Sequence, residues 1–112
     1  MKTLFQKIAD REIPSKMVYE DDVCFAIEDI NPQAPVHILV IPKRVISRLS
    51  SAVDSDAGTL GHLLVVAGKV AAEHGLSGGF RTVINSGPDA GETVPHLHVH
   101  LIGGRKLAWP PG

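Results

Sequence analysis

Three histidines near the C-terminus, His96, His98 and His100, alternate with large aliphatic residues. Successive side chains of an extended strand point to opposite faces, so the three histidines are expected to line one face of a strand. The intervening aliphatic side chains would line the other face and cover a core. Adjacent imidazoles repel one another when protonated and add little to a core. The row therefore predicts a chemical site that works near neutral pH.

Metal binding is one chemistry open to these histidines. Two histidines spaced i, i+2 on a strand can share a zinc ion, with a third ligand such as His37 from another element. Zinc binding by all three is difficult, because the Cα atoms of His96 and His100 would lie about 13 Å apart in a straight strand. A zinc-binding module remains an alternative, and the favoured interpretation contains no metal.

Nucleophilic catalysis at phosphorus is the favoured chemistry. A neutral imidazole attacks phosphorus, and the resulting phospho-imidazolium is a good leaving group when water attacks next. Neighbouring imidazoles depress one another's protonation, which keeps one ring neutral at physiological pH. His98, with a histidine on each side, is the best-placed nucleophile.

The elements that position these residues follow from local patterns. Thr3 and Gln6 form a capping-box pattern at the start of a short helix over residues 3–9. Strands are expected at 16–20, 23–28, 36–41 and 80–85, with 36–41 central because it is almost entirely aliphatic. A long helix is expected over residues 50–74, ending at Gly75. Its apolar face would comprise Leu60, Leu63, Leu64, Ala67, Val70 and Ala71.

Several polar residues lie between or beside these elements. The loop 86–93 is flexible and polar, and it can bring backbone N–H groups and a hydroxyl beside the histidine strand, as a phosphate or oxyanion site requires. His37 interrupts a central strand and is a candidate for the same site. His62 and His74, by contrast, are interpreted as structural or solvated.

Composition excludes several function classes. The 112 residues fit one domain, and the net charge of -1 gives no overall attraction to nucleic acid or to an anionic membrane. Cys24 is the only cysteine, so no internal disulfide is possible, and we expect it to be a buried filler in a cytoplasmic protein. Charged and apolar residues alternate over residues 1–10, so we do not expect this stretch to act as a signal peptide, and the sequence shows no apolar run of membrane-spanning length.

The stretch 96–102 matches the His-φ-His-φ-His-φ-φ signature of the histidine triad (HIT) superfamily, where φ is a hydrophobic residue. Residues 29–35, 37–43 and 103–112, the last ending in Trp-Pro-Pro-Gly, are similar to the Hint branch, the histidine triad nucleotide-binding proteins. The resemblance covers almost the whole chain from Thr3 onward.

This resemblance implies a single HIT domain over residues 1–112 with an α+β fold. Its five-stranded antiparallel sheet would carry one long and one short helix and would extend across a homodimer. The implied activity is that of a purine nucleoside phosphoramidase, which needs no cofactor. Such an enzyme hydrolyses the P–N bond of AMP-amine and some aminoacyl-AMP substrates through a covalent nucleotidyl-histidine.

Roles for individual residues also come from the resemblance. His98 resembles the nucleophile, His100 would contact the phosphate, His96 would support the nucleophile's surroundings, and His37 would complete the cluster. By the same resemblance, Asn85, Gly91 and Thr93 would contact the phosphate and the leaving group, and Asp29 would bind the ribose. The base pocket would be formed by Leu4, Phe5, Ile8, Ile27 and Ile30. Trp109 would contact the partner subunit. Trp109 would otherwise pack on its own chain.

Two positions depart from the better-known animal members of the branch. Thr93 stands where they carry a serine, which keeps the hydroxyl but restricts its rotamers and affects the preferred leaving group. Ala108 replaces a polar residue before the tryptophan.

Two further functions remain open. A dinucleoside polyphosphate hydrolase belongs to a sister branch, although the Trp-Pro-Pro-Gly ending argues against it. A non-enzymatic nucleotide-binding or scaffold protein would use the same pocket without turnover.

Overall fold

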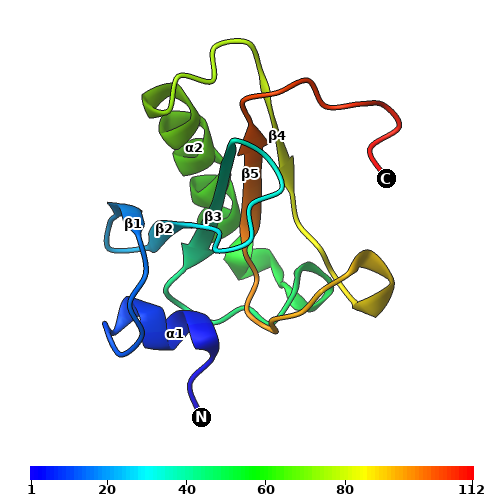
Figure 1. Ribbon diagram of the computed structural model, residues 1–112. Helices are drawn as coiled ribbons and strands as arrows, with labels where there is room; N and C mark the ends of the chain where they lie inside the picture. Colours follow the sequence, from blue (N-terminus) through cyan, green and yellow to red (C-terminus); the bar gives the residue numbers. More distant parts are fainter.

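The computed structural model describes residues 1–112 as an α+β fold built on one five-stranded antiparallel sheet (Figure 1). The strand order is β1-β2-β3-β5-β4. The strands are β1 (Met17–Glu20), β2 (Cys24–Glu28), β3 (Val36–Pro42), β4 (Phe80–Val83) and β5 (Val99–Gly103). The helices are α1 (Leu4–Ala9) and α2 (Ala57–Glu73), with short 3-10 turns at Leu49–Ser51, Asp54–Asp56 and Pro88–Ala90.

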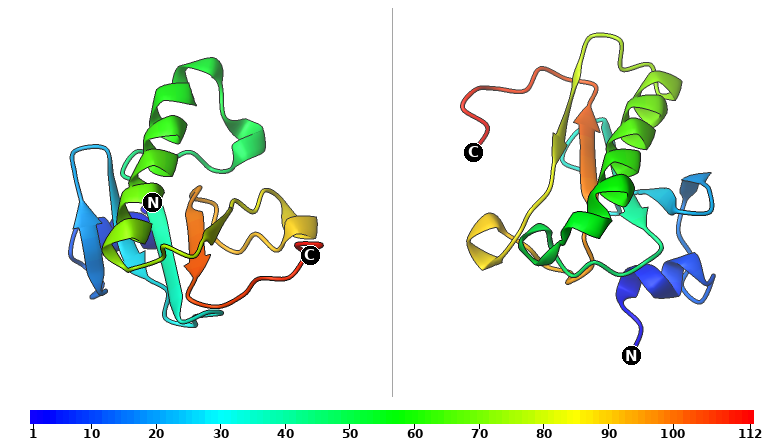
Figure 2. Two further views of the ribbon diagram at one scale, coloured as in Figure 1. Left: turned by 90° about the horizontal axis from the view of Figure 1, so that it is seen from above. Right: turned by 180° about the vertical axis from the view of Figure 1, so that it is seen from behind.

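The two helices lie against opposite faces of the sheet (Figure 2). Alternate residues of β2 and β3 point to each face, so Cys24, Ala26, Ile38 and Val40 join the core under α2. Phe25, Ile27, Leu39 and Ile41 form a smaller core with Phe5 and Ile8 of α1. His37 shares the strand parity of Leu39, which places it on the α1 face.

Helix α1 begins as its capping pattern predicts. Thr3 Oγ1 accepts a hydrogen bond from the Gln6 backbone N–H, and Gln6 Oε1 accepts one from the Thr3 N–H. Its apolar side is divided, because Phe5 and Ile8 are buried while Leu4 is 45% exposed. Leu4 is therefore free to line a surface hollow rather than a core.

Helix α2 is shorter than the expected span of residues 50–74, because it begins at Ala57. Ala52 and Val53 are extended, and the Asp56 carboxylate accepts the Val53 N–H and pairs with Arg44. These contacts turn the chain before the helix starts. The apolar face is also rotated, because Val66 is fully buried while Leu64 is 49% exposed. Gly75, at φ +72°, ends the helix as expected.

The histidine strand is also shorter than the alternating pattern predicts. Strand β5 begins at Val99, so His96 and His98 precede it. Leu97, Val99 and Leu101 nevertheless all enter the core under α2, as the alternation requires. The preceding strand, β4, ends at Val83 rather than at residue 85. Neither helix has the length and apolar composition needed to span a membrane.

Candidate active site

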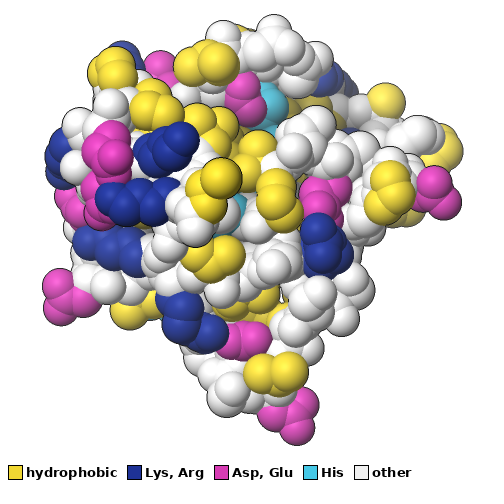
Figure 3. Space-filling view, turned by 90° about the horizontal axis from the view of Figure 1, so that it is seen from below, with side chains coloured by type: hydrophobic (Ala, Val, Ile, Leu, Met, Phe, Trp, Pro, Cys, Tyr) yellow, Lys and Arg dark blue, Asp and Glu magenta, His cyan; other side chains and the backbone are white.

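A cavity of about 330 Å³ lies between α1 and the sheet, and His98 and His100 form part of its wall. Its other lining residues are Leu4, Phe5, Ile8, Ile13, Pro14, Ser15, Ile27, Glu28, Asp29, Ile30, Leu39, Thr93 and Val94. A view from the α1 side shows only small areas of histidine among hydrophobic side chains (Figure 3). The cavity therefore combines an apolar wall with a few convergent polar groups, as small-molecule sites do.

A larger hollow of about 560 Å³ lies elsewhere, beside the α2–β4 connection and the C-terminal segment. Its walls comprise four glycines, three hydrophobic residues and the cations Arg81, Arg105 and Lys106, and no histidine lines it. These cations are already engaged in part, because Arg81 donates to the Ala108 carbonyl and Arg105 to the Gln33 carbonyl. Size alone thus does not identify the candidate site, and the histidines make the smaller cavity the better candidate.

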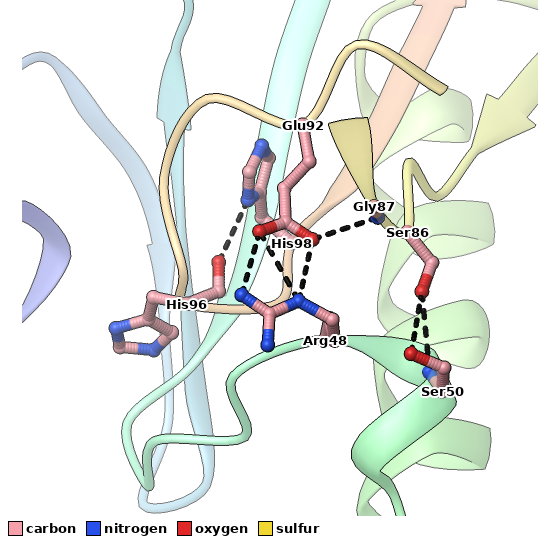
Figure 4. Close-up of polar contacts among 7 residues, drawn as sticks. All are labelled: Arg48, Ser50, Ser86, Gly87, Glu92, His96 and His98. Carbon is pink, nitrogen blue, oxygen red and sulfur yellow. Dashed lines mark hydrogen bonds and ion pairs between the residues drawn. The ribbon is translucent and has the colours of Figure 1, made fainter. Parts of the chain in front are cut away.

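The tautomer of His98 follows from its hydrogen bond to the backbone. His98 Nδ1 lies 2.8 Å from the His96 carbonyl oxygen (Figure 4). A carbonyl can only accept, so Nδ1 carries the proton and the neutral ring keeps its lone pair on Nε2. No other partner engages Nε2, and the edge of Phe5 packs against the ring at a centroid distance of 4.9 Å. The unprotonated nitrogen of His98 is therefore Nε2, the ring nitrogen that could act as a nucleophile.

His100 receives its orientation through a second histidine. The Gln33 backbone N–H donates to His37 Nδ1 at 3.0 Å, which leaves the neutral ring's proton on Nε2. His37 Nε2 lies 2.9 Å from His100 Nδ1 and therefore donates to it. The His100 proton is then on Nε2, on the ring edge away from His37. The chain Gln33–His37–His100 thus prepares an N–H donor next to His98, whose ring centroid is 5.0 Å away.

This contact depends on strand register. His100 of β5 is directly opposite Leu39 of β3, and His37 is opposite Ile102. The two histidines are therefore diagonal neighbours on one face, close enough for their rings to meet. Asp29, in the loop before β3, places Oδ2 3.4 Å from His37 Nε2. Its other carboxylate oxygen accepts the Asn31 N–H, so the loop 29–35 is held against the same cluster.

His96 has a different environment from the other two histidines. Its side chain is fully buried, and it is absent from the cavity wall. Nε2 lies 2.7 Å from the Pro42 carbonyl oxygen and Nδ1 lies 2.6 Å from Thr3 Oγ1. Three histidines were expected on one accessible face, but only His98 and His100 line the cavity. Burial lowers the pKa of His96, which keeps the ring neutral.

Loop 86–93 is held in place by side chains rather than being freely flexible. Glu92 accepts hydrogen bonds from Arg48 Nε and Nη2, each at 2.9 Å, and from the Gly87 N–H (Figure 4). The Arg48 guanidinium, followed by the Gly87 N–H, holds the pKa of Glu92 at about 2. Ser86 and Ser50 add a second connection. These contacts present Thr93 to the cavity.

The structure brings only some of the other predicted site residues to the cavity. Asn85 and Gly91 do not line the cavity, although both belong to the segment that leads to Thr93. Ile30 lines the rim and is 99% exposed. Trp109 is 82% exposed, so it does not pack on its own chain. Cys24 is fully buried, and burial raises the pKa of its thiol to about 12.

Several lining or supporting residues were missed by the sequence reasoning. Leu39 and Val94 complete the apolar wall, and Leu39 has a signal in hindsight, because it shares its strand parity with His37. The Gln33 backbone N–H and the Arg48–Glu92 pair carried no sequence signal. Their partners are distant in the chain or belong to the backbone.

In two places the structure brings together side chains of the types that bind metal ions. They are Asp29, His37 and His100 at the cavity, and Asp21, Cys24 and His62 beneath α2, with ligand atoms within 4.8 Å of one another in each group. In both groups the atoms already satisfy one another, as in the 2.6 Å contact between His62 Nε2 and Asp21 Oδ2. No buried side-chain polar atom lacks a partner, so neither group requires an ion to satisfy its polar atoms.

The lowered pKa of His100 should make the fold sensitive to mild acid. Burial, then the charges of His98 and His37, lowers the pKa of His100 to about 4, whereas the unfolded chain binds this proton near pH 6.5. The unfolded state therefore holds more protons between these values, and stability falls as pH falls. Between pH 7 and pH 5 the loss from His100 is on the order of 2 kcal/mol. Urea unfolding at both pH values measures it.

A His100→Asn variant is the control for this acid sensitivity. Its free energy of unfolding should change less between pH 7 and pH 5, because the titrating ring is gone. Equal pH dependence in the two proteins would contradict the assignment to His100.

Comparison with known proteins places these features in a family context. The family model described as the HIT domain matches residues 10–107. A HIT family hydrolase from Legionella pneumophila superimposes with a TM-score of 0.96, at 45% identity, covering 99% of this chain and 100% of that chain. A histidine triad nucleotide-binding protein from Candida albicans gives a TM-score of 0.81 at 30% identity, covering 97% and 83% of the two chains. A 14 kDa zinc-binding protein from Zea mays is 52% identical over 112 residues, covering 98% of this chain and 88% of the relative.

Proposed function

Because the chain belongs to the HIT domain family, whose solved members include hydrolases and a nucleotide-binding protein, we propose that it is a purine nucleoside phosphoramidase. The single observation that carries the proposal is the fixed tautomer of His98. Its Nδ1–H is held by the His96 carbonyl, so the free lone pair is on Nε2 of a ring that lines the cavity beside His100. A nucleophile and an N–H donor side by side suit attack at phosphorus.

The proposed reaction is a double displacement. The lone pair of His98 Nε2 attacks the α-phosphorus, the P–N bond breaks, and the amine leaves with a proton taken from solvent, to which the water of the second step returns one. Water then attacks the nucleotidyl-histidine, the new P–N bond breaks, AMP departs, and His98 is regenerated. His100 Nε2–H donates to the phosphoryl oxygen as its charge increases. Thr93 lines the cavity, and its hydroxyl is the group best suited by type to hydrogen-bond to the departing amine.

The walls of the cavity support a purine nucleotide as substrate. A volume of about 330 Å³ suits one nucleoside monophosphate at the lower end of the range for ligand sites. Phe5, Ile8, Ile27 and Leu39 offer an apolar surface for the base. Asp29 lines the cavity next to His37, and its carboxylate can accept hydrogen bonds from ribose hydroxyls.

A homodimer is part of the proposal. Strand β4 is at the edge of the sheet, and an exposed edge strand is a template for pairing with another copy. Leu64, Val65 and Phe80 are exposed hydrophobic residues on α2 and β4. The C-terminal segment carrying Trp109 extends away from the body (Figure 1). These features suit a partner subunit that buries the tryptophan beside its own site.

Zinc binding is a second candidate, favoured by the convergence of Asp29, His37 and His100. These donor types fit zinc, and the zinc-binding relative from Zea mays gives a reason to test it. An ion there would replace the 2.9 Å hydrogen bond between His37 and His100. The ion would not be needed to orient the proposed nucleophile, because the His96 backbone carbonyl already holds the His98 ring.

The substrate test compares an adenosine phosphoramidate with a diadenosine polyphosphate, using untagged protein with and without a chelator. We expect rapid AMP release from the phosphoramidate, little cleavage of the polyphosphate, and no effect of chelation. Faster cleavage of the polyphosphate would favour the sister activity. Stoichiometric zinc together with activity lost on chelation would favour the metal site, and nucleotide binding without turnover would favour a binding protein.

A further inference from the structure

A hydrogen bond joins the first helix to the histidine segment across 93 residues of sequence: Thr3 Oγ1 lies 2.6 Å from His96 Nδ1. The direction of this bond follows from the other side of the ring. His96 Nε2 must donate to the Pro42 carbonyl, so the neutral ring has only a lone pair at Nδ1. The Thr3 hydroxyl therefore donates its proton to His96.

The same threonine oxygen has a second task. It accepts the Gln6 backbone N–H at 3.1 Å and so caps helix α1. A threonine hydroxyl can donate once and accept at the same time, so both contacts coexist. Helix α1 is in this way attached by its first turn to a fully buried imidazole.

The backbone of His96 continues this connection into the active site. Its carbonyl oxygen accepts the Nδ1–H of His98, which determines the nucleophile's tautomer. Phe5, two residues after Thr3, packs edge-on against both imidazoles, at centroid distances of 5.6 Å to His96 and 4.9 Å to His98. The Thr3–His96 hydrogen bond therefore positions both the α1 wall of the base pocket and, through the His96 carbonyl, the His98 ring.

We infer that Thr3 is a positioning residue of the active site, acting through His96 on His98 and through α1 on the nucleotide pocket. The inference rests on the proposed function for its kinetic consequence but not for the contact itself. Without the hydroxyl donor, His96 Nδ1 is a buried acceptor with no partner. The ring then changes tautomer, rotates or admits water, and each response moves the segment that orients His98.

The kinetic experiment compares Thr3→Val, which lacks donor and cap, with Thr3→Ser, which keeps both. Gln6→Ala is the matched control, because it removes the other half of the capping box and leaves the Thr3–His96 bond intact. We expect Thr3→Val to lower kcat/KM for an adenosine phosphoramidate by roughly 10- to 100-fold, since small misplacements of reacting groups cost this much. Thr3→Ser and Gln6→Ala should stay within about threefold of wild type, because neither breaks the bond to His96.

The spectroscopic experiment needs no turnover. The ¹⁵N resonances of the imidazoles in the free protein report which ring nitrogen is protonated. Thr3→Val should shift the His96 Nδ1 resonance and weaken AMP binding, and Thr3→Ser and Gln6→Ala should not. Unchanged histidine resonances in Thr3→Val, or equal kinetic losses in Thr3→Val and Gln6→Ala, would overturn the inference. If wild type binds AMP without hydrolysing phosphoramidates, the proposed function fails while the resonances still decide the role of Thr3.

Discussion

Replacing His98 by alanine should abolish phosphoramidate hydrolysis while AMP still binds. The expected loss in kcat is about four orders of magnitude or more, as for removal of a covalent nucleophile in other enzymes. The reason is specific to this ring, because its Nδ1–H is held by the His96 carbonyl and its Nε2 is the unprotonated nitrogen at the cavity. Alanine keeps the backbone and its acceptor but removes the lone pair that attacks phosphorus.

The measurement combines steady-state AMP release with intact-protein mass after quenching within milliseconds. Wild type should gain the mass of one AMP, and His98→Ala should gain none. His62→Ala is a matched histidine control, because His62 lies on α2, across the sheet from the cavity, and pairs there with Asp21 of the β1–β2 turn. Wild-type turnover in His98→Ala would contradict the nucleophilic role. Release of AMP by wild type with no adduct at any quench time would favour direct attack by water.

Replacing His100 by alanine should lower kcat by about 100- to 1,000-fold and change AMP affinity much less. A donor that meets charge developing on a transferred group typically contributes this much when it is already oriented. Here the orientation comes from the Gln33 N–H through His37, which leaves the His100 proton on Nε2. Because burial keeps the pKa of His100 near 4, the ring is a neutral donor at physiological pH.

A double-mutant cycle with His37→Phe tests the same connection. Phenylalanine keeps a ring on β3 but cannot donate to His100 Nδ1, so His100 loses its fixed tautomer. We expect His37→Phe to lower kcat less than His100→Ala, and the double variant to resemble His100→Ala alone. Additive losses in kcat would show that the two histidines act independently. A kcat for His100→Ala within a fewfold of wild type would refute its role as a donor.

Local patterns predicted a large share of the fold. The alternation around His98 correctly sent Leu97, Val99 and Leu101 to one core, because side-chain direction in extended chain depends only on neighbouring residues. The capping box of Thr3 and Gln6 also formed as expected, since its partners are three residues apart. The resemblance of residues 96–102 to a known signature led to the correct family.

Local patterns were less reliable where several arrangements satisfy them. The apolar face of α2 includes Val66 and excludes Leu64, because the docking angle on the sheet selects among neighbouring rows of the helix. The helix begins at Ala57 rather than at residue 50, because Asp56 bonds to Val53 and Arg44 and turns the chain just before the helix.

Only the tertiary structure decided the surroundings and hydrogen-bond partners of each histidine. In sequence His96 and His100 are equivalent neighbours of His98, yet His96 is buried against Thr3 and Pro42 while His100 meets His37. The contact between His37 and His100 requires the β3–β5 register, and the Arg48–Glu92 pair joins residues 44 positions apart. Sequence by itself determined which residues were available and, in the extended segment around His98, which aliphatic side chains enter the core. Tautomers and partners depend on groups far away in the chain, so folding had to bring those groups together first.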